Sequence, residues 1–365
     1  MINLRFFPSK RVALYTAKLF LTRSLAVLVG LTLVLMTLDL LGESGKILAV
    51  HGNGEADLWR YVSYRVPMLI SRFLPFAVLL GTLIAFTGLN QHSEVVAMKA
   101  AGISAHQMLA PLVLASLFIA GGLFAFNERV VVNANAAVTA WSDNEYKPLP
   151  PVSGIVTNVW LLHGDDLVEA DRVGGTGADY HASNVTIYER EGGLLQRIIR
   201  ADRAQPAGNA WTLTNVRIYN SGMNMVQRVP RTTALQGVAP EQLTLAKVDP
   251  DQLDFWTLKE RVAQLKRAGR PYAEAEAGLW HKVTGPLSTL LMPLLAATAA
   301  FGLARSGQVL MRATIGMALG FAYFVADNFS LAMGNVGAYP PLMAAWAPFV
   351  LFLLVGEAVL IRSEE

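Results

Sequence analysis

The sequence predicts an α-helical membrane protein with six transmembrane helices and an all-β, jelly-roll-like domain inserted between the third and fourth helices. Two observations carry this prediction. Three long apolar stretches lie toward each end of the chain, and a polar middle with the alternating pattern of β-strands separates them. The predicted organisation is an N-terminal transmembrane half at 1–128, a β domain with a connecting helix at 129–272, and a C-terminal transmembrane half at 273–365.

Each apolar stretch is long enough to cross a bilayer as one helix. At a rise of about 1.5 Å per residue, about 20 apolar residues span a hydrocarbon core of roughly 30 Å. The overall composition agrees, since 53% of the residues are hydrophobic. The predicted spans are Ser24–Leu41, Val66–Leu89, Met108–Phe126, Val283–Leu303, Ala313–Met333 and Met343–Ile361.

The distribution of basic residues predicts the orientation. Lysine and arginine gather in the N-terminal tail and in the loop after the fourth span, and short loops rich in these residues stay in the cytoplasm. Both termini are therefore expected in the cytoplasm and the β domain outside it. The basic balance follows from this topology, so no nucleic-acid partner is expected. The residues concerned are Arg5, Lys10, Arg11, Lys18, Arg23, Arg305 and Arg312.

Two helices outside the spans are predicted. Residues 10–23 are expected to form a surface helix before the first crossing, and residues 252–268 a helix whose apolar stripe packs beneath the sheet. Between them, alternating stretches separated by glycine and proline predict an antiparallel sandwich or jelly roll. The expected strands are 154–162, 166–173, 184–188, 194–201 and 211–219.

Nothing in the sequence predicts catalysis or a cofactor. The run Gly42–Lys46 superficially resembles a phosphate-binding loop, but Leu40 and Ile47 break the required spacing and no βαβ unit surrounds it. His163 and its acidic neighbours match a hairpin turn better than a metal site. An ATP-driven activity would therefore need a separate ATPase.

The loop between the second and third spans predicts a short cytoplasmic helix over about 90–103. Asn90 is a suitable N-cap, Glu94 lies where the helix dipole favours an acid, and Gly102 suits the C-terminal end. Such a helix would present Glu94, Met98 and Ala101 on one face. An acid beside soft apolar residues is suited to docking in a cleft of a partner protein. The alternative is a merely interfacial helix.

Charged residues within or beside the spans form a second group of candidates. Arginine binds phosphate through paired, charge-assisted hydrogen bonds, so basic side chains near the outer boundary are candidate contacts for lipid phosphates. Snorkelling to ordinary headgroups is the alternative. The candidates are Lys46, Arg65, Arg72 and Lys282.

Asp39 and Asp327 lie in or at the edge of spans, where an ionised carboxylate needs a partner or water. Ion pairing or helix packing would satisfy this requirement. Two close carboxylates could instead form an intramembrane aspartic protease, although neither residue has the sequence context of such an enzyme.

Over nearly its whole length the chain closely resembles the LptF/LptG permeases of the lipopolysaccharide export machine. The most specific part is the run Ser93–Ser104, which is similar to that family's coupling-helix motif. Val248–Leu253, Trp280–Lys282 with Pro286–Leu287, Asp327, and Tyr339–Pro341 also match. Asp39 and Asp327 are more like the G subunits than the F subunits.

This resemblance implies an inner-membrane location and a mechanism. Two such permeases, one LptG-like and one LptF-like, would pair, and an LptB-like cytoplasmic ATPase dimer would bind their coupling helices, here Glu94, Met98, Ala101 and Gly102. Lipopolysaccharide from the outer leaflet would enter between the first and fifth spans and leave along periplasmic jelly rolls toward an LptC/LptA-like bridge.

The chain departs from its relatives at the basic residues that contact lipid A phosphates. Met36, Gly42, Glu43 and Met68 stand where those G subunits carry lysines, so Lys46, Arg65 and Arg72 are expected to substitute. A lipoprotein-extracting permease is an alternative transporter, but its usual arrangement of spans differs from three before and three after the domain.

Overall fold

The computed structural model describes residues 9–148, 156–174, 180–192, 194–220, 226–238, 248–267, 269–300 and 309–364. The chain divides into two compact units. The helical unit comprises Met1–Leu48, Gly54–Ala136 and Pro250–Glu365, and the sheet unit comprises Ala49–Asn53 and Ala137–Asp249.

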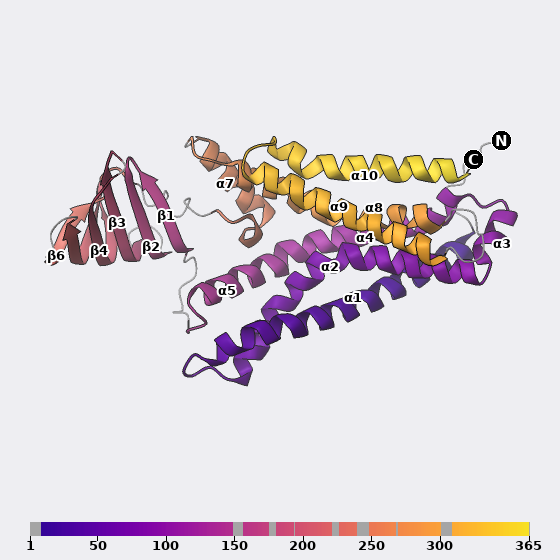
Figure 1. The fold of residues 1–365 in the computed structure, drawn as a ribbon, viewed down its shortest axis with the longest axis horizontal. Helices are drawn as coiled ribbons and strands as arrows, with labels where there is room; N and C mark the ends of the chain where they lie inside the picture. Colours follow the sequence, from indigo (N-terminus) through magenta and orange to yellow (C-terminus); the bar gives the residue numbers. More distant parts are fainter. Residues whose placement is uncertain are drawn as a thin grey trace. The chain divides into compact units, whose positions relative to one another are not determined.

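Long helices running side by side build the helical unit (Figure 1). Five helical segments in the described part of the chain are long and apolar enough to cross a membrane: Lys10–Leu48, Glu55–Gln91, Ala105–Asp143, Thr314–Asn335 and Pro341–Arg362. The long helices are α1 (Lys10–Leu48), α2 (Glu55–Gln91), α4 (Ala105–Phe126), α8 (Ala273–Ala300), α9 (Val309–Asn335) and α10 (Pro341–Glu364).

The expected span Val283–Leu303 coincides with α8 as far as Ala300, and its last residues lie outside the described part of the chain. Helix α8 is central, because it packs against α2, α4, α7, α9 and α10.

The first helix differs from the sequence prediction. Residues 10–23 do not form a separate surface helix but are the first turns of α1, which continues unbroken to Leu48. The physical reason is visible in the sequence, since neither proline nor glycine interrupts the run before Gly30.

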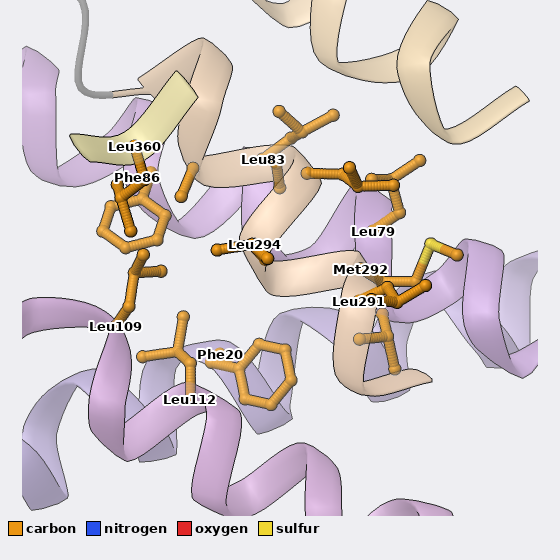
Figure 2. Close-up of a cluster of buried hydrophobic side chains, with 14 of the residues drawn as sticks. Phe20, Leu79, Leu83, Phe86, Leu109, Leu112, Leu291, Met292, Leu294 and Leu360 are labelled. Carbon is orange, nitrogen blue, oxygen red and sulfur yellow. The ribbon is translucent and has the colours of Figure 1, made fainter. Parts of the chain in front are cut away.

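A buried apolar cluster joins these helices (Figure 2). Phe20 of α1, Phe86 of α2, Leu112 of α4 and Leu291 of α8 are fully buried or nearly so. The crossing of α1 and α2 is especially close: a Cβ atom on Gly81 would lie 2.5 Å from the backbone nitrogen of Ser24. Small residues at such crossings let helix backbones approach in membranes.

The chain passes from α4 into a π-helical turn, η1 (Asn127–Val131), and on into α5 (Val132–Asp143). On its return it forms a short 3-10 turn, η3 (Pro250–Gln252), and helix α7 (Phe255–Arg267). The stripe Leu258, Val262 and Leu265 of α7 is buried as predicted. Its partner is α8 of the helical unit rather than the sheet, so that part of the prediction was wrong.

The sheet unit contains one six-stranded antiparallel sheet in which neighbours in sequence are neighbours in the sheet. The five expected strands are confirmed, and a sixth, β6, was missed. Pro230 interrupts its pattern, and proline within a strand is typical of the edge position that β6 occupies. The strands are β1 (Val156–His163), β2 (Asp166–Gly174), β3 (His181–Glu191), β4 (Leu194–Ala207), β5 (Ala210–Asn220) and β6 (Val226–Ala234).

These described strands form a meander, without the strand crossover that a jelly roll requires. A single sheet nevertheless buries one continuous apolar cluster. Along each of the four strands β2 to β5, buried residues occupy alternate positions except at one place, where two successive buried residues lie three positions apart. The residues flanking the gap are Ala170 and Val173, Ala182 and Val185, Ala201 and Ala204, and Leu213 and Val216.

The gaps align across the sheet, because Ser183 lies opposite both Arg172 and Arg203, and Arg203 lies opposite Thr214. Two asparagines in this line, Asn184 and Asn215, have positive φ angles of 50° and 54°, a conformation that asparagine tolerates better than most residues. A line of polar residues therefore crosses the sheet between two groups of buried residues.

Candidate functional site

The predicted cytoplasmic helix is present as α3 (Glu94–Ala100). It is shorter than expected, since α2 continues to Gln91 and Ser93, with a φ of 57°, is the N-cap residue. Asn90 is therefore part of α2 and not a cap. The left-handed backbone conformation of Ser93 ends α2, so that α3 can begin in a different direction.

Gly102 ends α3 as predicted. Its φ is +79°, its N–H donates to the carbonyl of Lys99 at 2.9 Å, and the N–H of Ile103 donates to the carbonyl of Met98 at 3.0 Å. These two bonds define a Schellman motif, in which glycine supplies the left-handed residue.

Helix α3 is fixed on one side and open on the other. Val95 is buried, and Met98 and Ile103 pack against the cluster in Figure 2. Glu94 is half-buried and accepts a hydrogen bond from the Tyr15 hydroxyl of α1 at 3.2 Å. Val96 is exposed, and it is an apolar surface residue that the sequence analysis did not single out.

Of the predicted docking residues, Met98 therefore faces the core, while Ala101 and Gly102 are exposed. Helix α3 lies at the same end of the bundle as the C-terminal end of α10 (Figure 1). Near this end Nε2 of His106 in α4 lies 3.5 Å from the Glu357 carboxylate of α10.

Asp39 of α1 is held by two side chains of α2. Arg65 donates from Nε to Oδ2 at 2.9 Å and from its terminal nitrogen to Oδ1 at 3.0 Å. The Tyr61 hydroxyl donates to Oδ2 at 2.8 Å. This two-pronged geometry is the strong form of an arginine–carboxylate pair, and it ties α1 to α2.

Asp327 of α9 is buried and its Oδ2 lies 3.0 Å from Nε2 of His281 in α8. Its Oδ1 atom is buried and forms no hydrogen bond with any residue in the described part of the chain. Asp39 and Asp327 thus each bind a basic side chain of another helix. This arrangement differs from that of a protease, in which two carboxylates share a proton.

The four basic candidates differ in what they contact. Arg65 binds Asp39 as described, and Lys46 pairs with Glu43 at 2.8 Å within α1. Lys282 lies 3.4 Å from Glu128. Arg72 is exposed on α2 and forms no ion pair or hydrogen bond with the residues that the structure describes.

Glu128 is a residue that sequence reasoning missed. It lies in the π-helical turn η1, and one of its carboxylate oxygens accepts a short hydrogen bond from the backbone N–H of Phe255 at the start of α7. Its other oxygen faces Lys282 of α8. An acid next to the end of the third span was the available signal, but the partners lie more than a hundred residues away.

Asp254 caps the next two amides of α7. Its Oδ1 atom accepts from the backbone nitrogens of Trp256 and Thr257, both at 3.0 Å. Hydrogen bonds from the side chain and the backbone of Thr257 lower the pKa of the Asp254 carboxyl group, because they stabilise its charged form.

Among the described residues, no group of three or more histidine and acidic side chains could hold a metal ion. The segment around His163 is the predicted hairpin: His163 lies opposite Asp166, and Gly164 has a φ of +63°.

The fold and these sites define a multi-pass membrane protein in which a β-sheet is inserted between two groups of apolar helices. Residues 14–362 match the family described as "Lipopolysaccharide export system permease LptF/LptG". The chain belongs to this family, and is thus a transporter subunit rather than an enzyme.

Two curated relatives extend the comparison. The "Lipopolysaccharide export system permease protein LptG" of Escherichia coli (strain K12) is 26% identical over 93% of this chain and 94% of the relative. The protein of the same name from Haemophilus influenzae is 25% identical over 94% of this chain and 95% of the relative.

Proposed function

We propose that this chain is the LptG-like permease subunit of an ABC-type exporter. The exporter extracts lipopolysaccharide from the outer leaflet of the inner membrane and passes it to a periplasmic bridge like LptC and LptA. An LptB-like cytoplasmic ATPase dimer supplies the energy, and a second, LptF-like permease completes the cavity. The family match over residues 14–362 supports this function, and the geometry of α3 is the structural observation that carries it.

In the proposed topology α8 is the fourth of six spans, in addition to the five helical segments given above, and both termini are cytoplasmic. The position of α3 at the same end of the bundle as the C-terminal end of α10 supports this, since both would face the cytoplasm (Figure 1). Helix α7 lies at the opposite end of the helical unit and would face the periplasm (Figure 1). The sheet unit would belong to a periplasmic jelly roll, of which the described strands form one continuous sheet.

The coupling role of α3 is supported by its mixture of rigidity and exposure. Val95 and Met98 anchor the helix to the core, so a force applied to its open side is transmitted to α2 and α4. The hydrogen-bond donor to Glu94 is a neutral hydroxyl group, that of Tyr15. A cationic side chain of the ATPase would bind this carboxylate more strongly, because a charged donor adds a direct Coulomb attraction that a neutral hydroxyl cannot supply.

The proposed contact for a lipid phosphate is Arg72. The other three basic candidates already face carboxylates, whereas Arg72 is exposed. The lipid would enter between α1 and α9, whose apolar side chains are widely exposed. Examples are Leu25 and Leu33 of α1, and Phe321 and Phe329 of α9.

The test is a reconstituted complex of this chain with a second permease of the family and the ATPase. We expect lipopolysaccharide release to the bridge protein to require ATP. Glu94→Lys should abolish co-purification of the ATPase, because it places two cations opposite each other. Glu55→Lys, an exposed acid at the other end of α2, is the matched control and should leave co-purification unchanged. Unimpaired ATPase binding by Glu94→Lys would contradict the coupling role of α3.

A further inference from the structure

Two of the four covalent connections between the units, those that flank residues 137–249, leave the helical unit near one carboxylate. The chain passes into the sheet unit after Ala136 and returns at Pro250. Glu128 precedes the first boundary and Phe255 follows the second, and the two residues are directly hydrogen-bonded. The outgoing and the returning segments are therefore fastened to each other within the helical unit.

The carboxylate of Glu128 completes the N-terminus of α7. The first amides of a helix have no partner within the helix. Asp254 binds those of Trp256 and Thr257, and Glu128 binds that of Phe255. Two carboxylates thus lie at the positive end of the α7 dipole, where negative charge is favoured.

The other oxygen of Glu128 connects this N-terminus to α8. Lys282 lies 3.4 Å from it, and the two side chains are only 13% and 14% exposed. A glutamine at position 128 would leave Lys282 without an acidic partner, and it would offer the Phe255 amide a neutral acceptor in place of a carboxylate, which weakens that hydrogen bond. Losing the partner of a buried charge is costly, so Lys282 depends on the acid at this point.

Further contacts hold the same place together. The Ser71 hydroxyl of α2 donates to the side chain of Asn127 at 2.6 Å, and the rings of Phe124 and Phe255 meet edge to face with centroids 6.2 Å apart. Near the boundaries themselves, Asn135 donates to the backbone carbonyl of Asp251 at 3.1 Å.

The return segment also packs closely on α8. A Cβ atom on Gly278 would lie 2.4 Å from the Cβ of Pro250, so only glycine allows η3 to approach the helix this closely. Glu128 lies in a π-helical turn. Such turns are rare, and they frequently occur at functional sites.

We propose that Glu128 is a positioning residue for export: it fastens the two connections to α8, so that a movement of α4 or α8 reaches the sheet unit through both connections together. This inference rests on the proposed function, since it concerns how ATP-driven movement of the helices reaches the periplasmic part. Glu128 contacts no substrate in this scheme. It acts through α7 and Lys282.

The test compares Glu128→Gln with Lys282→Met in the reconstituted transporter. Lipopolysaccharide release and ATP hydrolysis are measured separately, together with thermal unfolding. We expect Glu128→Gln to lower the lipid released per ATP by about fivefold or more, the lower range of an energetic coupling between sites, while ATP hydrolysis continues. Lys282→Met keeps the Phe255 hydrogen bond and should show a smaller loss in the same ratio. Hydrogen exchange at the Phe255 amide should accelerate in Glu128→Gln only.

The control is Glu145→Gln, which breaks the exposed pair with Lys147 and should leave the ratio unchanged. A wild-type ratio in Glu128→Gln would overturn the proposal. A parallel loss of hydrolysis, release and thermal stability would also overturn it, because that pattern indicates a merely structural tie. If Glu128→Gln does not fold, the ratio in Lys282→Met decides. No ATP-dependent release by the wild-type complex would refute the proposed function instead.

Discussion

Arg65 is predicted to stabilise the pairing of α1 with α2 rather than to bind cargo. The decisive change is Arg65→Met, because methionine replaces the aliphatic stem of arginine but carries no charge. It deletes both bonds to Asp39 and leaves that carboxylate with the hydrogen bond from Tyr61.

The expected loss lies between two limits. Exposed ion pairs contribute about 0–1 kcal/mol, and breaking a buried pair costs about 3–5 kcal/mol. The Arg65 and Asp39 side chains are 33% and 22% exposed, so the loss should be about 2 kcal/mol. For a folding unit the size of the helical unit, at roughly 2–4 °C per kcal/mol, the unfolding temperature should fall by about 4–8 °C.

The assay is thermal unfolding of the purified protein in a neutral detergent, with Asp39→Asn and the double variant measured alongside. Because both single changes remove the same interaction, the double variant should lose less than the sum of the two. Arg72→Met is the matched control: Arg72 lies seven residues further along the same helix, is exposed, and should not contribute to stability. Equal unfolding temperatures for Arg65→Met and Arg72→Met, or additive losses in the double variant, would refute this reasoning.

Three other predictions concern packing, capping and the sheet core. Gly81→Ala should destabilise the α1–α2 crossing by about 1–3 kcal/mol, since the added Cβ would meet the Ser24 backbone. Gly88→Ala is the control, because a Cβ there would meet no atom within 4 Å and should cause no such loss. Unfolding in detergent measures both variants. Asp254→Ala should cost about 1 kcal/mol at neutral pH. The pKa of Asp254 is lower in the folded state than in the unfolded state, so its contribution to stability is present above the unfolded-state pKa and disappears as the pH falls through the folded-state pKa. Hydrogen exchange at the start of α7 should therefore differ between variant and wild type at pH 7 and become equal in acid. Trp211→Phe should destabilise the sheet unit by roughly 1–3 kcal/mol, because the buried carbonyl of Val238 loses its 2.8 Å hydrogen bond. Trp160 is 43% exposed, so Trp160→Phe should have little effect. Chemical unfolding measures both variants, and equal losses of stability would contradict this assignment.

Much of the architecture could be predicted because its signals are local. Apolar runs marked the long helices, alternation marked five of the six strands, and Gly102 marked the end of α3. Where the predictions failed, local signals were ambiguous. The N-terminal turns of α1 have a surface-like composition but no break, and Pro230 concealed β6.

The candidate site was predicted less completely. Glu94 and its helix could be found from capping and charge, but the inward position of Met98 and the exposure of Val96 depend on how α3 packs on α2 and α4. The sequence indicated four basic candidates but not the partners of their side chains. The structure separates them, since three face carboxylates and Arg72 is exposed without such a partner in the described part of the chain.

By itself, the sequence determined which segments are apolar enough to span a membrane, five of the six described strands, and the place of a short helix between the second and third spans, because hydropathy and capping act over a few neighbouring residues. Only the tertiary structure decided the partners of the charged groups. Asp39 binds a residue 26 positions away, His281 one 46 away, and Glu128 an amide 127 away and a lysine 154 away. Such pairs form because poorly solvated charges need a partner, and packing alone determines which partner lies within reach.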